Sequence, residues 1–401
     1  MLNLLAGIVA SFVAAPLSDD DWTIKADVVY PVSKGPIENG VVRVQDGKIV
    51  AVGKGGGGNV LECAAVTPGL VDLSVQIDTG AASVEQAREA VVRLSVEDAL
   101  DLFSFRWERE LRSGVTTALA NPLDMDVLGG FGVVVKTGGA PTLARRLVRA
   151  NAVLRGAIGT QPSSGNNTPR GSEPNSFYFR RPTTRMGVEW LARDAFYRAL
   201  QGVGSNDPVQ AEENAILKKV LAGEIVLMLQ AKATQVVRTA IYLKEEFGIP
   251  RVILDHSIEC WREPELLVRS GAAVVLAPFA PGGRHVDGTV PDTYFQPLDA
   301  AKQLSDLGVL FALSAHGGRE VGARLTDQAG FAMRGGLSFD AALAAVTLTP
   351  ATLVGVADRV GSLEVGKDAD LVLWNGKPFE PTSRVIGVLL DGELVLDPRL
   401  R

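Results

Sequence analysis

Residues 67–76 of the chain read TPGLVDLSVQ, and this stretch decides how the rest of the sequence is interpreted. Its first three residues are a turn signal, and the Leu- and Val-rich residues that follow predict a buried strand. Before it, residues 26–30, 40–44 and 48–52 are typical of short strands, the last two joined by an Asp46-Gly47 hairpin turn. After it, the pattern changes to strands that alternate with helices.

The alternating region predicts parallel βαβ units. Apolar, β-branched runs indicate strands at residues 115–120, 132–136, 225–229, 251–254, 273–276 and 309–313. Helical patterns lie between several of them, near residues 183–200, 208–221 and 235–246. Strands separated by helices of this length pair in parallel, and about 280 residues of such units indicate a closed (β/α)8 barrel.

Both ends of the chain are predicted to be rich in strands. At the carboxyl end, residues 371–374, 385–390 and 394–396 read as strands, the last two flanking the turn Asp391-Gly392. Two such ends that bracket a barrel meet most simply in one small domain. We therefore predict an α/β fold with a TIM-like barrel over residues 67–355 and a composite β-sandwich domain over residues 22–66 and 356–401.

The composition is that of a globular chain with a large core. Of the 401 residues, 46% are hydrophobic and 21% are charged, which excludes disordered and fibrous classes. The net charge of −6 makes nucleic acid a poor partner. The two cysteines are too few for a disulfide framework or a zinc ribbon. The three histidines, His256, His285 and His316, exclude any mechanism that needs four.

Residues 1–16 read MLNLLAGIVASFVAAP and contain an apolar stretch that is too short to span a bilayer. Its length is that of the hydrophobic part of a signal peptide, and small residues follow at a cleavage position. This predicts export to the periplasm or the medium, or a cytoplasmic location if the segment is instead a strand or helix packed on the body. Stable membrane insertion is not expected.

Residues 160–184 form a long polar stretch without an apolar period. Loops of this length in compact domains are usually functional lids or disordered segments. We predict that this loop is a lid over the barrel mouth; the alternative is a surface loop without a functional role. Arg180, Arg181 and Arg185 cluster at its end, where they would clamp an anionic ligand or form a solvated basic edge.

Several motifs resemble the amidohydrolase superfamily. Residues 67–72, TPGLVD, resemble the entry to its first barrel strand, and residues 348–351, LTPA, with 361–372, GSLEVGKDADLV, resemble its return to the small β-domain. Residues 113–117, SGVTT, and 129–136, GGFGVVVK, resemble a branch related to imidazolonepropionases. The resemblance covers residues 22–397 and implies the fold predicted above. It also implies hydrolysis of carbon–nitrogen bonds in cyclic amides, amidines and isoaspartyl-type substrates by metal-activated water, usually on zinc.

The resemblance implies metal ligands that this chain lacks. The family ligands are a His-x-His at the end of strand one, single histidines after strands five and six, and an aspartate after strand eight. These positions fall on Ser74 and Gln76, on or next to Ala231, on His256 and on Ala315. Because catalytic zinc is bound by imidazole, thiolate or carboxylate, we predict that the binuclear site is lost and that no cofactor is required. The alternative is a single divalent metal such as zinc, held by His256, His316 and an acid such as Glu259.

The polar side chains left at the predicted mouth are the candidate site residues. His256, His316 and Lys136 are the candidate catalytic residues, and Ser74 and Gln76 join the three arginines as candidate substrate-binding residues. A metal-free acid–base reaction would use one histidine with Lys136 as the electrophile. Neutral, hydrogen-bonded histidines and a lysine paired with a carboxylate are the alternatives.

Different classes of function follow from these residues. The first is a non-catalytic barrel, a pseudoenzyme, that binds a small-molecule ligand or a partner. The second is a hydrolase of carbon–nitrogen bonds in a cyclic amide or related small substrate, with a remodelled mononuclear or metal-free site. The third is a chain that stabilises an active homologue, and a homo-oligomer is compatible with each.

Overall fold

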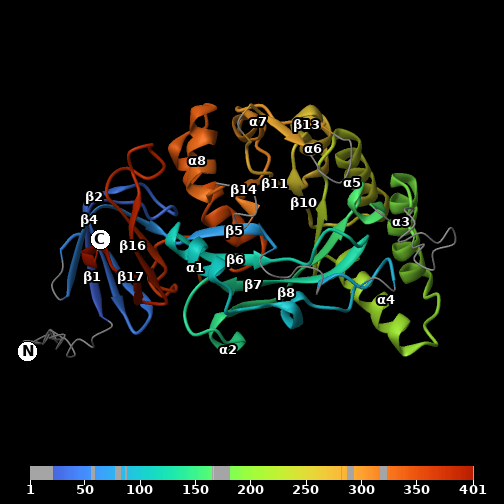
Figure 1. Ribbon diagram of the computed structural model, residues 1–401, viewed down its shortest axis with the longest axis horizontal. Coiled ribbons are helices and arrows are strands. Elements are labelled where there is room, and N and C mark those ends of the chain that lie inside the picture. Colours follow the sequence, from blue (N-terminus) through green and yellow to red (C-terminus); the bar gives the residue numbers. More distant parts are fainter. Residues whose placement is uncertain are drawn as a thin grey trace, which may run out of the picture.

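The computed structural model describes residues 21–55, 59–76, 83–85, 88–164, 166, 181–280, 282–286, 293–316 and 323–400. The predicted signal peptide, Arg180 and most of residues 160–184 lie outside the described residues. Two sheets, one of eight strands and one of seven, carry nearly all of the described strands (Figure 1). No helix in the described part of the chain is long and apolar enough to cross a membrane.

The larger sheet is a nearly closed barrel. Its strands in spatial order are β5 (Leu70–Val75), β6 (Val115–Ala120), β7 (Leu128–Lys136), β8 (Leu147–Ala157), β9 (Val226–Gln230), β10 (Val252–Ser257), β11 (Ala273–Leu276) and β14 (Phe311–Leu313). Neighbours pair in parallel, except that β7 is antiparallel to both β6 and β8. The predicted barrel is confirmed, but the antiparallel direction of β7 was not predicted.

Helices pack around this barrel (Figure 1). They are α1 (Phe105–Arg112), α2 (Leu143–Arg146), α3 (Arg185–Gln201), α4 (Pro208–Leu221), α5 (Thr234–Phe247), α6 (Pro264–Ser270), α7 (Ala300–Asp306), α8 (Leu325–Arg334), α9 (Phe339–Ala345) and α10 (Leu348–Leu353). The helix boundaries follow local chemistry. The Thr184 hydroxyl accepts a hydrogen bond from the Gly187 amide at the start of α3, and Gly202 ends that helix at φ 66°.

The second sheet is built from both ends of the chain. Its strands in spatial order are β17 (Glu393–Leu396), β16 (Val385–Leu390), β15 (Leu371–Trp374), β4 (Val60–Pro68), β1 (Trp22–Val29), β2 (Ile37–Gln45) and β3 (Lys48–Gly53). The antiparallel pair of β4 and β15 joins the two ends. The predicted meeting of the ends in one sheet system is therefore confirmed. A separate hairpin pairs β12 (Arg284–Val286) with β13 (Thr293–Phe295).

Asp72 holds the two edge strands of the barrel together. β5 and β14 are the edges of the eight-stranded sheet as it is described. The Asp72 carboxylate accepts hydrogen bonds from the Ser314 hydroxyl at 2.6 Å and from the Ala315 amide at 2.9 Å. Asp72 is completely buried. A charged residue within the apolar first strand thus fastens the barrel where no strand pairing does so.

Candidate functional site at the barrel mouth

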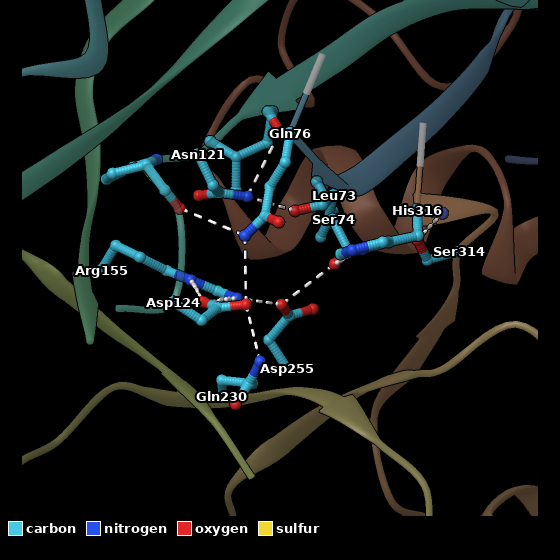
Figure 2. Close-up of polar contacts among 12 residues, drawn as sticks. Leu73, Ser74, Gln76, Asn121, Asp124, Arg155, Gln230, Asp255, Ser314 and His316 are labelled. Carbon is cyan, nitrogen blue, oxygen red and sulfur yellow. Dashed lines mark hydrogen bonds and ion pairs between the residues drawn. The ribbon is translucent and has the colours of Figure 1, made fainter. Parts of the chain in front are cut away.

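Polar side chains gather where the parallel strands of the barrel end (Figure 2). All are buried: Ser74 and Gln76 at the end of β5, Arg155 on β8, Gln230 on β9, Asp255 and His256 on β10, and His316 after β14. Side chains two positions apart on a strand share a face. Val153, Met228 and Ile253, two positions before Arg155, Gln230 and Asp255, belong to one apolar cluster. The polar network therefore lies on an apolar layer of the barrel.

Arg155 is the centre of this network. Its Nη2 atom lies 2.6 Å from Oδ1 of Asp124 and 2.6 Å from Oδ2 of Asp255, and its Nε donates to the same oxygen of Asp124 at 2.9 Å. Burial alone would lower the pKa of Arg155, but the Asp124 and Asp255 carboxylates outweigh it and raise the pKa. The guanidinium therefore keeps its positive charge inside the barrel.

Two glutamines complete the surroundings of Asp124. Gln230 donates from Nε2 to Oδ2 of Asp124 at 2.7 Å, and Gln76 donates from Nε2 to the same oxygen at 3.1 Å. Gln76 also donates to the carbonyl oxygen of Pro122 at 3.2 Å. Asp124 thus accepts from Arg155 on one oxygen and from both glutamines on the other, which fixes the orientation of the carboxylate.

Ser74 connects Asp255 to His316. Its hydroxyl donates to Oδ2 of Asp255 at 3.0 Å, and its oxygen lies 3.1 Å from Nδ1 of His316. Because a hydroxyl has one proton, this donation makes Nδ1 of His316 the donor in the second contact. Burial raises the pKa of Asp255, with Asp124 acting in the same direction and with Arg155 and Ser74 opposing it.

The two described mouth histidines are in contact and have unusual backbones. The ring centroids of His256 and His316 are 4.6 Å apart, with the planes at 65°. Their φ angles are 48° and 54°. Residues other than glycine rarely adopt positive φ, and such strain clusters at functional sites. The structure therefore brings four of the candidate residues, Ser74, Gln76, His256 and His316, into one site.

Lys136 lies at the opposite end of the barrel, which corrects its expected place at the mouth. It ends the antiparallel strand β7 and pairs with Thr117, near the start of β6. Its Nζ atom lies 2.6 Å from Asp370, 3.0 Å from Asp368 and 3.1 Å from Asp391. Burial alone would lower the pKa of Lys136, but the three carboxylates outweigh it and raise the pKa. Lys136 thus anchors the strand-rich tail to the barrel.

Two of the three candidate arginines, Arg181 and Arg185, lie within the described residues. Arg181 is exposed and forms an ion pair with Glu89 at 3.0 Å, and Arg185 is the first residue of α3. The side-chain amide of Asn166 donates to the carbonyl oxygens of Pro162 and Pro182 and ties the two ends of the loop together. Whether the loop covers the mouth stays a prediction.

The centre of the network was not predicted from the sequence. Arg155, Asp124, Gln230 and Asp255 were not among the candidate residues. A signal was present, because Arg155 interrupts the apolar run of residues 152–157, AVLRGA. A charged side chain within a buried strand has to be paired, so this arginine predicts carboxylates nearby.

The donor atoms that the described residues place at the mouth do not fit a catalytic zinc site. Ser74, Gln76, Ala231 and Ala315 offer no histidine or carboxylate, and the Asp124 and Asp255 oxygens facing the centre are bound to a cation. Glu259, the acid considered for a single metal, instead accepts hydrogen bonds from the amide and hydroxyl of Thr234. Within the described residues, no group of three or more His, Cys, Asp or Glu side chains is placed to hold a metal ion.

A cavity of about 840 Å³ lies apart from the mouth. It is formed by α1, α8 and the segment 379–385, at the junction of the barrel and the second sheet. Phe105, Phe331, Arg112 and Arg384 are among its lining residues. None of the mouth residues lines it, so the polar network and this cavity are separate features.

Comparisons with known sequences show where similarity lies. A family model described as the amidohydrolase family matches residues 298–395. The chain is 27% identical over 309 residues to the amidohydrolase tasK of Hapsidospora irregularis, a match that covers 71% of this chain and 31% of that protein. Over 53 residues it is 51% identical to an imidazolonepropionase of Syntrophobacter fumaroxidans, covering 13% of this chain and 12% of that protein. The matches thus span a third or less of these relatives.

Solved structures extend the similarity over nearly the whole chain. An amidohydrolase from Thermotoga maritima MSB8 superposes with a TM-score of 0.79 at 26% identity, covering 94% of this chain and 100% of that one. A beta-aspartyl dipeptidase from Fervidobacterium islandicum AW-1 has the same fold, with a TM-score of 0.53 at 16% identity and coverage of 95% and 98%.

Proposed function

The chain belongs to the amidohydrolase superfamily, and from this premise we propose that its barrel mouth binds a small polar molecule without a divalent metal and without hydrolysing it. One observation carries the proposal. The guanidinium of Arg155, bound to Asp124 and Asp255, occupies the centre of the mouth. A buried positive charge at this point repels a divalent cation and uses the carboxylate oxygens that would bind it.

Three buried polar atoms of the network support ligand binding. Nη1 of Arg155, Oε1 of Gln230 and Oδ1 of Asp255 have no hydrogen-bond partner among the described residues. Buried polar groups without partners are costly, and a bound molecule or ordered water normally satisfies them. One donor and two acceptors suit a ligand that carries both a carbonyl oxygen and N–H groups. A cyclic amide has this chemistry.

The connection of Asp255 to Ser74 argues against turnover. In a nucleophilic triad the acidic group orients the base, and the base takes the proton of the nucleophile. Here Asp255 accepts the hydrogen bond of the Ser74 hydroxyl itself, and Nδ1 of His316 donates to the serine oxygen. The histidine is therefore not placed to deprotonate the hydroxyl. Free water is a negligible nucleophile without a metal or a base that activates it.

A second candidate function is hydrolysis of a carbon–nitrogen bond without a metal. The 3.1 Å contact between Ser74 and His316 and the positive φ angles of both histidines favour it. In this case the Ser74 hydroxyl would turn from Asp255 to His316 on substrate binding, and the ring proton of His316 would sit on Nε2 so that Nδ1 accepts the serine proton. This mechanism predicts that Ser74→Ala abolishes turnover while binding persists.

The test is a combined binding and turnover screen. Cyclic amides and β-aspartyl dipeptides are added to the purified protein, with and without zinc, and the melting temperature and product formation are recorded. We expect at least one cyclic amide to raise the melting temperature and to be recovered unchanged. Gln230→Ala should weaken that binding, and Gln303→Ala, which changes a partly exposed helix residue bonded to Asp299, should not. Product formation that depends on His256 would contradict the proposal.

A further inference from the structure

We infer that the Arg155 guanidinium takes the place of a divalent cation in the barrel mouth, so that its removal turns Asp124 and Asp255 into a cation site. The inference rests on the metal-independent mouth proposed above, and it does not depend on the ligand. It assigns a specific role to one residue: the side chain of Arg155 prevents a divalent cation from binding between Asp124 and Asp255.

The geometry of the two carboxylates supports this role. A single nitrogen, Nη2 of Arg155, lies 2.6 Å from an oxygen of Asp124 and 2.6 Å from an oxygen of Asp255. Calcium binds carboxylate oxygens at about 2.3–2.6 Å, and magnesium at about 2.0–2.1 Å. The point that the nitrogen occupies is therefore at coordination distance, or within a small adjustment of it, from both oxygens.

The carboxylates are held in this geometry by other residues. Gln76 and Gln230 fix the outer oxygen of Asp124, and the Ser74 hydroxyl donates to the oxygen of Asp255 that faces Arg155. These bonds do not involve the guanidinium, so they remain when Arg155 is shortened. The carboxylates then stay aimed at the vacated point.

Charge balance supplies the driving force. Asp124 and Asp255 are 7% and 0% exposed, and Arg155 is the cation bonded to both. Two neighbouring buried carboxylates cannot both stay ionised without a compensating charge, so one takes up a proton or the pair binds a cation. Shortening Arg155 to alanine also leaves space for an ion and its water ligands. Oxygen donors of this kind select hard cations such as calcium, magnesium and manganese.

The experiment measures Mn²⁺ binding by electron paramagnetic resonance and calorimetry. The proteins are the wild type, Arg155→Ala, Arg155→Lys and the double variant Arg155→Ala/Asp255→Asn. We expect Arg155→Ala to bind one Mn²⁺ at least about tenfold more tightly than the wild type, because two carboxylates become available. Arg155→Lys should bind as weakly as the wild type, and the double variant should lose the gain. Equal binding by the wild type and Arg155→Ala would overturn the inference.

A second arm uses the unaltered chain and covers the case in which Arg155→Ala does not fold. Wild-type protein is refolded from urea with Mn²⁺ or without it and then passed through a desalting column. The inference predicts the same refolding yield and no retained ion. Retained Mn²⁺ that disappears in Asp255→Asn would overturn it. The proposed function fails separately, if a cyclic amide is hydrolysed while the Mn²⁺ results are as expected.

Discussion

Nη2 of Arg155 lies 2.6 Å from Oδ2 of Asp255, and the two side chains are 1% and 0% exposed. The pair joins β8 to β10 across the intervening strand β9. Removing charges from water costs several kcal/mol per ion, so a buried pair persists only with good geometry and further hydrogen bonds. Asp124 and Ser74 provide those bonds here. The mouth of this barrel is therefore held together by a fixed internal cation.

Shortening Arg155 should destabilise the fold strongly. Arg155→Ala leaves Asp124 and Asp255 buried without their cation, and breaking a buried pair costs about 3–5 kcal/mol. The control is Arg198→Ala, since Arg198 is 47% exposed and lies 3.6 Å from Asp194 on α3. That change should cost less than about 1 kcal/mol. Urea unfolding in a metal-free buffer measures both, and similar losses would count against a central role for Arg155.

Lys136 should matter for stability and not for the mouth. Lys136→Met leaves Asp370, Asp368 and Asp391 close together without the cation between them, and the expected loss is about 3–5 kcal/mol. Lys302→Met removes an exposed pair with Asp306 on α7 and should cost at most about 1 kcal/mol. Unfolding of the two variants provides the comparison. Unchanged stability of Lys136→Met would show that the tail does not depend on this anchor.

Asp368 should give the fold an acid-sensitive component. Burial alone would raise the pKa of Asp368, but Lys136, Lys48 and Arg359 outweigh it and lower the pKa to about 2. The usual pKa of an unfolded Asp is about 3.9, so the stabilisation is complete above that value and is lost as the pH falls through 2. The contribution is of the order of 2 to 3 kcal/mol.

The check is the free energy of unfolding between pH 5 and pH 2. The wild type should lose stability more steeply below pH 4 than Asp368→Asn, because the variant lacks the titrating group. Parallel curves for the two proteins would refute this assignment.

Asp72 should stabilise the junction between the edge strands β5 and β14 of the barrel. Asp72→Ala removes the acceptor for Ser314 and for the Ala315 amide, so the strand edges β5 and β14 lose this connection. Hydrogen exchange should become faster in residues 70–76 and 311–316. Exchange in β16, which belongs to the second sheet, serves as the internal control. Faster exchange everywhere would indicate global destabilisation and not a local opening.

The sequence predicts the architecture well because apolar periodicity reports burial directly. The direction of β7 could not be predicted in this way. Residues 128–136 form an apolar run, which indicates a buried strand but not its direction in the sheet. The length of the connection between β6 and β7 does indicate the direction of β7. Parallel neighbours need a crossover of about a dozen residues or more, and the segment 121–127 between β6 and β7 is shorter. Lys136 was expected at the wrong end of the barrel for this reason.

The site was predictable only in part. Ser74, Gln76, His256 and His316 follow from the ends of barrel strands, where side chains of different strands converge. The residues around Arg155 could not be predicted, because Asp124, Asp255 and Gln230 come from separate strand ends and connections. Their contacts depend on strand order and register, which local sequence patterns do not contain.

The zinc content of the purified chain tests the central claim most directly. The protein is incubated with excess zinc, separated from free metal by gel filtration and subjected to elemental analysis, with His256→Ala treated in parallel. A mouth centred on the Arg155 guanidinium predicts far less than one zinc per chain in both proteins. One or more zinc ions per wild-type chain, absent from His256→Ala, would contradict it.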